Sequence, residues 1–146
     1  MKRTTITLLV AIMALSVLNV EGRSPRKSSG RVIHYHFSGY MTDNKGDYPI
    51  ELDFDASNKG LSNIVYKNVT HGGKIHMKCT KFSGIKRMKD GFGGYSDYLD
   101  YFTIVGKDGS KDFVMSMERM GNCPYEGTAR VGSKKLKVML YIDIAD

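Results

Sequence analysis

The segment Lys134–Ala145 alternates between apolar and polar residues, and this pattern constrains the fold more than any other feature of the chain. The apolar side chains that would share one face are Leu136, Val138, Leu140, Ile142 and Ile144. The other face would carry Lys137, Met139, Tyr141 and Asp143. An amphipathic helix needs apolar residues three and four positions apart, so this period of two predicts a half-buried β-strand.

Seven further segments have strand-like sequences, and turn-forming residues separate them at regular spacing. The predicted strands are Val32–Tyr40, Tyr48–Ala56, Leu61–Val69, Lys74–Phe82, Tyr98–Gly106, Asp112–Glu118 and Tyr125–Val131. Asp-Gly, Gly-Gly and Gly-Ser pairs lie in the connections, where they supply the positive φ angles that tight hairpins need. The strands are therefore expected to pair as four consecutive hairpins in an antiparallel meander.

About eight antiparallel strands in this order either close into an up-and-down barrel or fold over as a β-sandwich. Closure removes the exposed strand edges, so the meander favours a lipocalin-like barrel over the sandwich. No stretch has the pattern of a long amphipathic helix. We therefore predict an all-β fold, with residues 31–146 forming a single β domain.

The first 22 residues have the features of a secretory signal peptide. A basic start at Met1–Arg3 precedes an apolar run from Ile6 to Leu18, and small or modest residues follow at Val20–Gly22. The apolar run is too short to span a bilayer comfortably, so no membrane span is expected. We expect cleavage after Gly22 and a secreted or periplasmic location. Residues 23–30, with the sequence RSPRKSSG, would form a flexible basic lead.

The formal net charge of +7 raises the question of an anionic partner, because a basic exported protein can meet nucleic acid, anionic glycan or anionic lipid. Most lysines, however, occupy alternating strand positions or turns, which is typical of a solvated surface. The one cluster, Lys86–Asp90, is short and has no interleaved aromatic residues. This differs from a nucleic-acid footprint, so we expect no nucleic-acid partner.

Two cysteines, Cys79 and Cys123, give an even count, which in an exported protein indicates a disulfide. The bond would stabilise the fold by on the order of 4 kcal/mol in the chain-entropy model. Cys79 would point inward, and His76 would project from the opposite face of the same strand, so no local Cys–His pair is expected. Two buried free thiols would also fit the sequence.

His34 and His36 share one face of the first predicted strand, opposite Tyr35 and its apolar neighbours. We therefore expect a solvated pair on the outer side rather than a metal site. The acids of the second strand would line its outer face as solubilising charge: Glu51, Asp53 and Asp55. No carboxylate pair, nucleophile elbow or phosphate loop is recognisable. We predict no catalytic residues, no metal, no cofactor and no enzymatic activity.

The stretch DGFGGYSDYLDYF, residues 90–102, is the richest in aromatic residues. Its first half is predicted to be a mobile surface loop. Its second half is predicted to be a strand with Leu99 and Phe102 on opposite faces. Tyrosine rings beside acids suit contacts with sugars or proteins, although an aromatic strand covering one end of the core is the plainer explanation. The candidate binding residues are Phe92, Tyr95, Asp97, Tyr98 and Tyr101.

The succession FSGY, YPIELDF, YKN and GGKIHM runs through the first four predicted strands. It resembles small exported all-β proteins of Gram-negative bacteria, most of which have no assigned function. The elements that carry the resemblance are Tyr48–Ile50 and Gly73–Ile75. The resemblance implies export and a lipocalin-sized β-fold, and it carries over no catalytic residues.

These features predict an exported, non-enzymatic binding module that contacts a glycan, a lipophile or a protein through the loop end of a small β-barrel. Bulky inward residues on most strands predict a filled interior, which favours the rim over the lumen as the contact site. Two alternatives stay open. One is a structural or interaction protein of the cell envelope without a small ligand, and the other is a hydrolase or isomerase at the barrel mouth.

Overall fold

The computed structural model describes residues 31–89, 91–121 and 124–143, and every secondary-structure element in these ranges is a strand. The elements are β1 (Ile33–Asp43), β2 (Gly46–Ser57), β3 (Gly60–Asn68), β4 (Lys74–Phe82), β5 (Ile85–Lys89), β6 (Tyr95–Leu99), β7 (Tyr101–Asp108), β8 (Lys111–Arg119), β9 (Tyr125–Val131) and β10 (Lys134–Asp143). The predicted signal peptide and basic lead, residues 1–30, lie outside the described residues.

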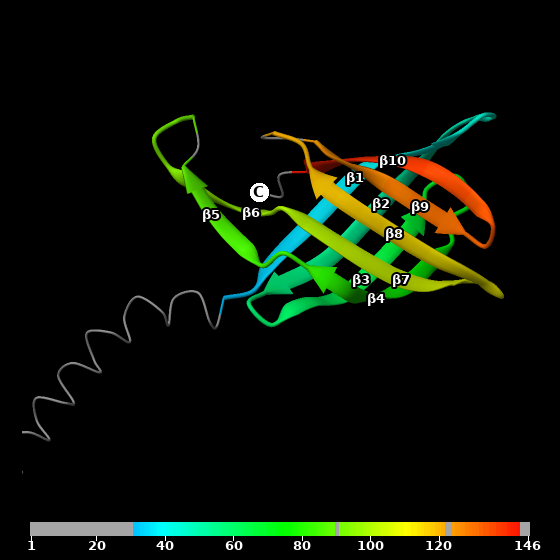
Figure 1. Cartoon of the computed structure of the whole chain (residues 1–146), viewed down its shortest axis with the longest axis horizontal. Helices are drawn as coiled ribbons and strands as arrows, with labels where there is room; N and C mark the ends of the chain where they lie inside the picture. The colour runs from blue at the N-terminus through cyan, green and yellow to red at the C-terminus, as the bar shows by residue number, and fades with distance from the viewer. Residues whose placement is uncertain (1–30, 90, 122–123, 144–146) are drawn as a thin grey trace, which may run out of the picture. The chain divides into compact units, whose positions relative to one another are not determined.

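Eight of these strands form a closed antiparallel barrel in the order β1-β10-β9-β8-β7-β4-β3-β2 (Figure 1). Strands that are consecutive in the chain pair with each other, except that β4 pairs with β7 and that β1 pairs with β10 to close the ring. Closure leaves no barrel strand with an unpaired edge. The predicted eight-stranded up-and-down barrel is confirmed, and the sandwich alternative is excluded.

The predicted turn chemistry closes the four hairpins of the barrel, which are β1–β2, β3–β4, β7–β8 and β9–β10. In the β7–β8 hairpin, Asp108 pairs with Lys111 across the turn. Gly109 between them has a φ angle of 62°, a left-handed conformation that glycine adopts without a steric penalty.

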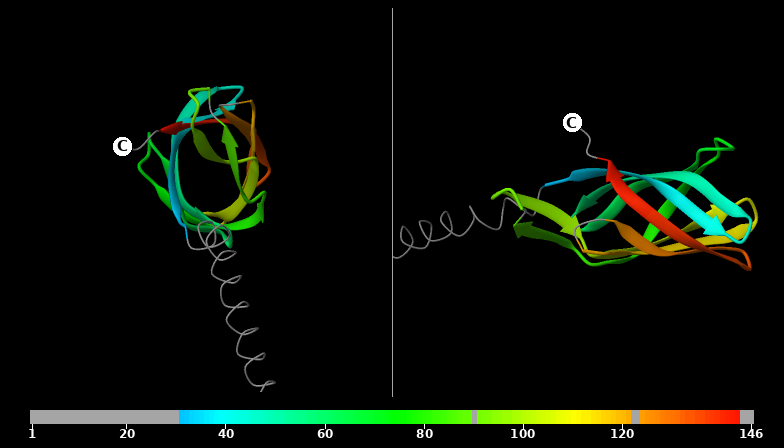
Figure 2. Two further views of the ribbon diagram at one scale, coloured as in Figure 1. Left: turned by 90° about the vertical axis from the view of Figure 1, so that its left-hand side faces the viewer. Right: turned by 90° about the horizontal axis from the view of Figure 1, so that it is seen from above.

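The remaining two strands, β5 and β6, form a separate two-stranded sheet at one end of the barrel (Figures 1 and 2). We call this hairpin, residues 85–99, the arm. The predicted loop in the first half of residues 90–102 is wrong at Tyr95–Asp97, which belong to β6, and β5, Ile85–Lys89, was not among the predicted strands. A two-stranded sheet outside a core needs no alternation of apolar and polar residues, so the pattern that identifies half-buried strands is missing here.

Large side chains fill the interior of the barrel. The largest residues with less than 2% exposure are Phe37, Ile50, Leu52, Phe54, Leu99, Phe102, Ile104, Phe113, Met115, Tyr125 and Leu140. The ring of Phe37 lies at the centre of an aromatic cluster, with centroid distances of 5.3 Å to Tyr125 and 5.4 Å to Phe54. A filled interior was predicted from the sequence. A binding partner would therefore contact the barrel ends or the outer wall rather than the lumen.

Candidate functional site

The arm continues the β4–β7 ladder beyond the rim of the barrel. Phe82 pairs with Phe102 at the end of that ladder, and Ile85 pairs with Leu99 at the start of the arm, so the register is the same in both. Gly84 lies between the two ladders with a φ angle of 86°, a conformation that other residues rarely adopt. The arm is therefore one long hairpin with β4 and β7, bent at this glycine.

The side chains that follow Tyr98 do not alternate between two faces as predicted. Leu99 and Phe102 are both fully buried, whereas an uninterrupted strand would place them on opposite faces. The strand breaks at Asp100. The amides of Asp100 and Tyr101 donate to Oγ of Ser83 at 2.9 and 3.3 Å. The Ser83 hydroxyl thus satisfies main-chain groups where the ladder is interrupted.

The arm does not bring all the predicted binding residues onto one surface. The side chain of Phe92 is 100% exposed at the turn of the arm. Tyr95 is 63% exposed, and the guanidinium carbon of Arg87 lies 5.5 Å from its ring centre. Tyr98 is half-buried on the other face of β6, and the exposed Tyr101 belongs to β7. The arm therefore presents mainly Phe92 and Tyr95 to solvent.

Two tyrosines of the barrel hold β6 in place from inside the core. The hydroxyl of Tyr35 donates to the carbonyl oxygen of Asp97 at 2.9 Å. The hydroxyl of Tyr125 donates to the carbonyl oxygen of Leu99 at 2.7 Å. Burial raises the pKa of Tyr125, so its hydroxyl remains a proton donor at any physiological pH. The main chain of Asp97 therefore has a structural contact that the sequence did not predict.

Arg119, the last residue of β8, fixes the opposite face of the arm. One of its guanidinium nitrogens lies 3.1 Å from Oδ1 of Asp100 and 3.1 Å from the sulfur of Met88. Its guanidinium carbon lies 5.0 Å from the ring centre of Tyr98. Lys86 binds the other carboxylate oxygen of Asp100. The hydrogen bonds from Lys86 and Arg119 lower the pKa of Asp100, so this carboxylate stays charged and holds both cations.

On the outer wall, a row of alternating carboxylates and imidazoles crosses three strands. We call it the His–Asp row, and it contains Asp55, His34, Asp53, His36 and Asp143. The imidazole of His34 lies 2.8 Å from Asp55 and 3.4 Å from Asp53. That of His36 lies 2.7 Å from Asp53 and 3.3 Å from Asp143. The outward direction of both histidines was predicted, but their pairing with acids was not.

The hydrogen bond between His34 and Asp55 favours the charged form of each group. Each of the four ring nitrogens of the row lies within 3.4 Å of a carboxylate oxygen. The hydrogen bond to Asp55 raises the pKa of His34. Hydrogen bonds from Asn63 and then from His34 lower the pKa of Asp55. Within the part of the chain that the structure describes, no group of three or more His, Cys, Asp or Glu side chains is placed to hold a metal ion.

Cys79 forms no disulfide with a described residue, and it lies on the partly buried side of β4, where it packs against the core as predicted. Its Sγ donates to the carbonyl oxygen of Lys81 at 3.3 Å, and burial raises the pKa of the thiol. Cys123 lies outside the described residues. The bond between the two cysteines therefore stays a prediction.

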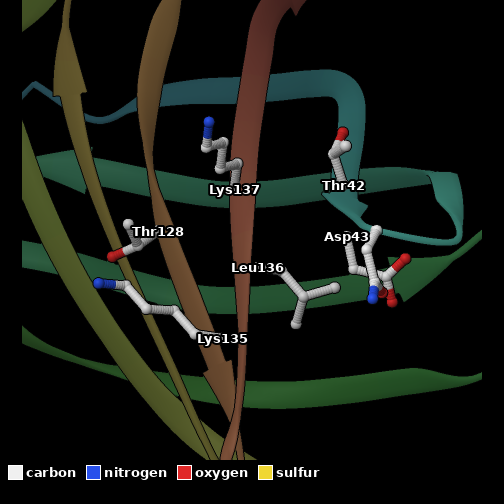
Figure 3. A pocket seen from close by; sticks show the side chains of 7 residues that line it. Thr42, Asp43, Thr128, Lys135, Leu136 and Lys137 are labelled. Carbon is white, nitrogen blue, oxygen red and sulfur yellow. The ribbon is translucent and has the colours of Figure 1, made fainter.

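A groove of about 590 Å³ lies on the wall beside the turns that join β1 to β2 and β9 to β10. Figure 3 shows Thr128 and Lys135 on one side of β10, with Thr42 and Asp43 on the other. Asp43 is not available as a ligand group, because its carboxylate binds Lys134. This hydrogen bond lowers the pKa of Asp43 to about 2. The groove is therefore basic in its accessible groups.

None of the described residues belongs to a helix that is long and apolar enough to cross a membrane. Comparison of the chain with protein-family models, with curated proteins and with solved structures finds no match. The resemblance to small exported all-β proteins stays a prediction. Function has to be inferred from the geometry of the arm and of the wall.

Proposed function

We propose that this protein is a non-enzymatic binding module and that the exposed part of the arm is its contact surface. The observation that carries the proposal is the grouping of exposed apolar side chains on an anchored hairpin. Phe92 is 100% exposed at the turn and Tyr95 is 63% exposed a few residues later, whereas Met88, 38% exposed, lies on the other face of the hairpin beside Arg119. Single exposed apolar side chains are ordinary on a protein surface, whereas a group of them marks an interaction site.

The residue types on the arm support a protein partner ahead of a glycan. Phenylalanine, tyrosine, methionine and arginine are the side chains that are enriched at protein interfaces, and the arm exposes each of them at Phe92, Tyr95, Met88 and Arg87. The guanidinium group of Arg87 lies over the ring of Tyr95, so the two exposed side chains offer a joint surface to a partner. A glycan would use the same ring as a stacking surface and is the second partner class.

The anchoring of the arm supports recognition of a defined surface. The hydroxyls of Tyr35 and Tyr125 hold β6, and Arg119 holds the other face. A contact element that is already ordered loses less conformational entropy when it binds. This favours a specific partner over a loosely adsorbed one.

The filled interior supports a contact at the surface and not a lipophile held in the lumen. The rings of Phe37, Phe54 and Tyr125 occupy the centre of the barrel. The ring centroid of Phe37 lies 5.4 Å from that of Phe54 and 5.3 Å from that of Tyr125. An envelope component without a small ligand is the second candidate function, and the same filled interior favours it. A hydrolase or isomerase has less support, because the His–Asp row lies on the wall, where its imidazoles already face carboxylates.

The proposal includes export to the periplasm or beyond the cell, on the strength of residues 1–22. The mature protein would begin at Arg23. Mass spectrometry of protein from the producing cells should therefore show loss of the first 22 residues. Recovery of the intact chain from the cytosol would contradict this part of the proposal.

Photo-cross-linking in the producing cells tests the contact surface. Benzoylphenylalanine replaces Phe92 in one variant and Tyr40 in a matched control, because Tyr40 is a 49% exposed ring on the barrel wall. We expect an adduct of discrete mass from position 92 that decreases sharply when Tyr95→Ser is added. Equal labelling from both positions, or no adduct from position 92, would contradict the arm as the contact surface.

A further inference from the structure

The outer wall of β4, β7, β8, β9 and β10 carries a transverse row of side chains that lie directly opposite one another. This cationic row consists of Lys78, Val105, Val114, Arg130 and Lys135. A parallel hydroxyl row consists of Thr103, Ser116, Thr128, Lys137 and Thr42. We call the two rows together the basic face. Both point outward, because the residues that alternate with them are buried, for example Met115 and Ala129.

The cations of the basic face form no ion pair with any described residue, although the carboxylates of Glu118 and Glu126 lie beside Lys137. Arg130 and Lys135 are exposed cross-strand partners, and like charges in directly opposite positions destabilise a sheet. Among the described residues neither they nor Lys78 and Lys137 form an ion pair. An anion that lies along the wall would remove this repulsion.

Three grooves follow one another across the basic face and share lining residues. The first, of about 650 Å³, is lined by residues that include Lys78 and Val114, and also by Asp112, whose carboxylate pairs with Lys107. The second, of about 280 Å³, shares Val114 with the first and extends to Arg130 and Lys135. The third, the groove of Figure 3, shares Lys135 with the second and continues to Lys137. This succession of grooves, the track, therefore runs across neighbouring strands from β4 toward β1, and cations line each of its parts.

We infer that the basic face binds an anionic polysaccharide, a chain of sugars that bear carboxylate or sulfate groups, laid across the strands. Lys78, Arg130 and Lys135 would pair with the acid groups along the track. Hydroxyls such as those of Ser116 and Thr128 would exchange hydrogen bonds with sugar hydroxyls. The half-buried Val105 and Val114 would form an apolar floor for the sugar rings.

Other polyanions fit the basic face less well. Single-stranded nucleic acid is held largely by base stacking on exposed aromatic rings, and neither row contains an aromatic residue. An anionic bilayer would favour protruding apolar side chains, whereas Val105 and Val114 are half-buried. An acidic peptide has no strand edge to pair with, because the barrel is closed. The arm contributes nothing to this site, so the inference is independent of the proposed function.

Binding to alginate and to heparin tests the inference with one carboxylated and one sulfated probe. The test variant combines Lys78→Gln, Arg130→Gln and Lys135→Gln. The control variant combines Lys45→Gln, Lys59→Gln and Lys89→Gln, which removes the same charge from exposed positions elsewhere. For at least one probe we expect the Kd to rise about tenfold or more in the test variant and less than about twofold in the control variant. Only the test variant should show a shallower salt dependence of binding.

A second variant keeps the charge constant and combines Ser116→Ala with Thr128→Val. We expect several-fold weaker polysaccharide binding with an unchanged salt dependence, while Ser62→Ala, at an exposed position of β3 outside the basic face, should leave this binding unaffected. Thermal melting checks that each variant is folded. Equal losses in the two charge variants would show a mere net-charge effect and overturn the inference. So would binding to neither polysaccharide, or tighter binding to oligothymidylate, to phosphatidylglycerol vesicles or to polyglutamate.

Discussion

The hydroxyl of Tyr125 donates a hydrogen bond to the main-chain carbonyl of Leu99 across 2.7 Å, and neither residue is exposed to solvent. Tyr125 begins β9 and Leu99 ends β6, so this bond ties the arm to the barrel from inside the core. The bond from Tyr35 to the carbonyl of Asp97 repeats the arrangement two residues away. The base of the arm is therefore part of the packed core, while its turn reaches solvent.

Tyr125→Phe should destabilise the protein by about 1–2 kcal/mol, because the substitution leaves the buried carbonyl of Leu99 without its donor. It should also speed hydrogen exchange of the amides in residues 85–99. Denaturant unfolding and exchange mass spectrometry measure the two effects. Tyr141→Phe is the control, since Tyr141 is 43% exposed on the wall. Unchanged exchange in the arm of Tyr125→Phe would show that the bond does not hold it.

Arg119→Met should loosen the other face of the arm, because it removes the contacts of the guanidinium with Asp100, Met88 and Tyr98. The Arg119 side chain is 12% exposed, so we expect a loss of stability on the order of 2 kcal/mol. The pKa of Asp100 should rise toward its usual value, which carbon-detected NMR titration measures.

Arg119→Lys separates charge from shape in this contact. Lysine keeps the charge but has no planar group to stack on Tyr98, so Arg119→Lys should recover only part of the stability that Arg119→Met loses. Arg130→Lys on the wall, where no ion pair is described for Arg130, should have almost no effect on stability. Full recovery by lysine at position 119 would show that stacking contributes little.

The barrel could be predicted from the sequence because its signals are local. The alternation of apolar and polar residues that includes Val138 and Leu140 identifies a strand without reference to any partner strand. The Asp-Gly pair at Asp108 identifies a turn in the same way. Four such hairpins in succession leave few topologies. The closing pair, β1 with β10, then follows from the advantage of having no free edge.

The arm and its anchors could not be predicted, because they depend on contacts between residues far apart in the chain. Nothing in the sequence around Tyr35 or Arg119 indicates that they meet residues 97–100. The His–Asp row is different, since its signal was present. His34 and His36 alternate in one strand as Asp53 and Asp55 do in the next, and hairpin pairing brings side chains of one face together.

The His–Asp row should make stability depend on pH in a defined window. The pKa of His34 is raised above its ordinary value of 6.5, so its contribution is complete below that pH and is lost as the pH rises through the raised pKa. The pKa of Asp55 is lowered from 3.8, so its contribution is present above that pH and is lost as the pH falls through the lowered pKa. The pair of His34 and Asp55 should therefore stabilise the barrel most between these two ordinary values.

His34→Gln tests this window. The side chain is 59% exposed, so the free energy of unfolding should fall by only about 0.5 kcal/mol at pH 5.5, and by less at pH 8.5. His76→Gln is the control, because His76 is an exposed histidine on β4 without an ion pair among the described residues. Equal effects of the two substitutions, or a larger effect of His34→Gln at the higher pH, would contradict this assignment.

The predicted bond between Cys79 and Cys123 has a direct test. Intact mass spectrometry of the exported protein, with and without reductant, should show a two-proton difference if the bond forms. Cys79→Ser would then lower the free energy of unfolding by several kcal/mol under oxidising conditions, as loss of a long-loop disulfide does. Equal masses, together with labelling of both cysteines by a thiol reagent in the denatured protein, would show two free thiols and exclude the bond.

The barrel needs glycine at two positions where neighbouring strands approach closely. A Cβ atom at Gly39 would lie 1.9 Å from the carbonyl oxygen of Met139, and one at Gly127 would lie 1.8 Å from that of Ser116. Main chain that is paired in a closed barrel has little freedom to move away. Gly39→Ala and Gly127→Ala should therefore each destabilise the protein by at least about 3 kcal/mol, beyond the usual cost of overpacking.

Gly73→Ala is the matched control, because a Cβ atom there would meet nothing within 4 Å. We expect its free energy of unfolding to stay within about 0.5 kcal/mol of the parent protein. Denaturant unfolding followed by far-ultraviolet circular dichroism measures all three variants, and soluble yield reports any that fail to fold. Parental stability of Gly39→Ala would show that β1 and β10 can separate locally, and parental stability of Gly127→Ala would show the same for β8 and β9. The barrel would then be less tightly paired at that position than the hydrogen-bonded register indicates.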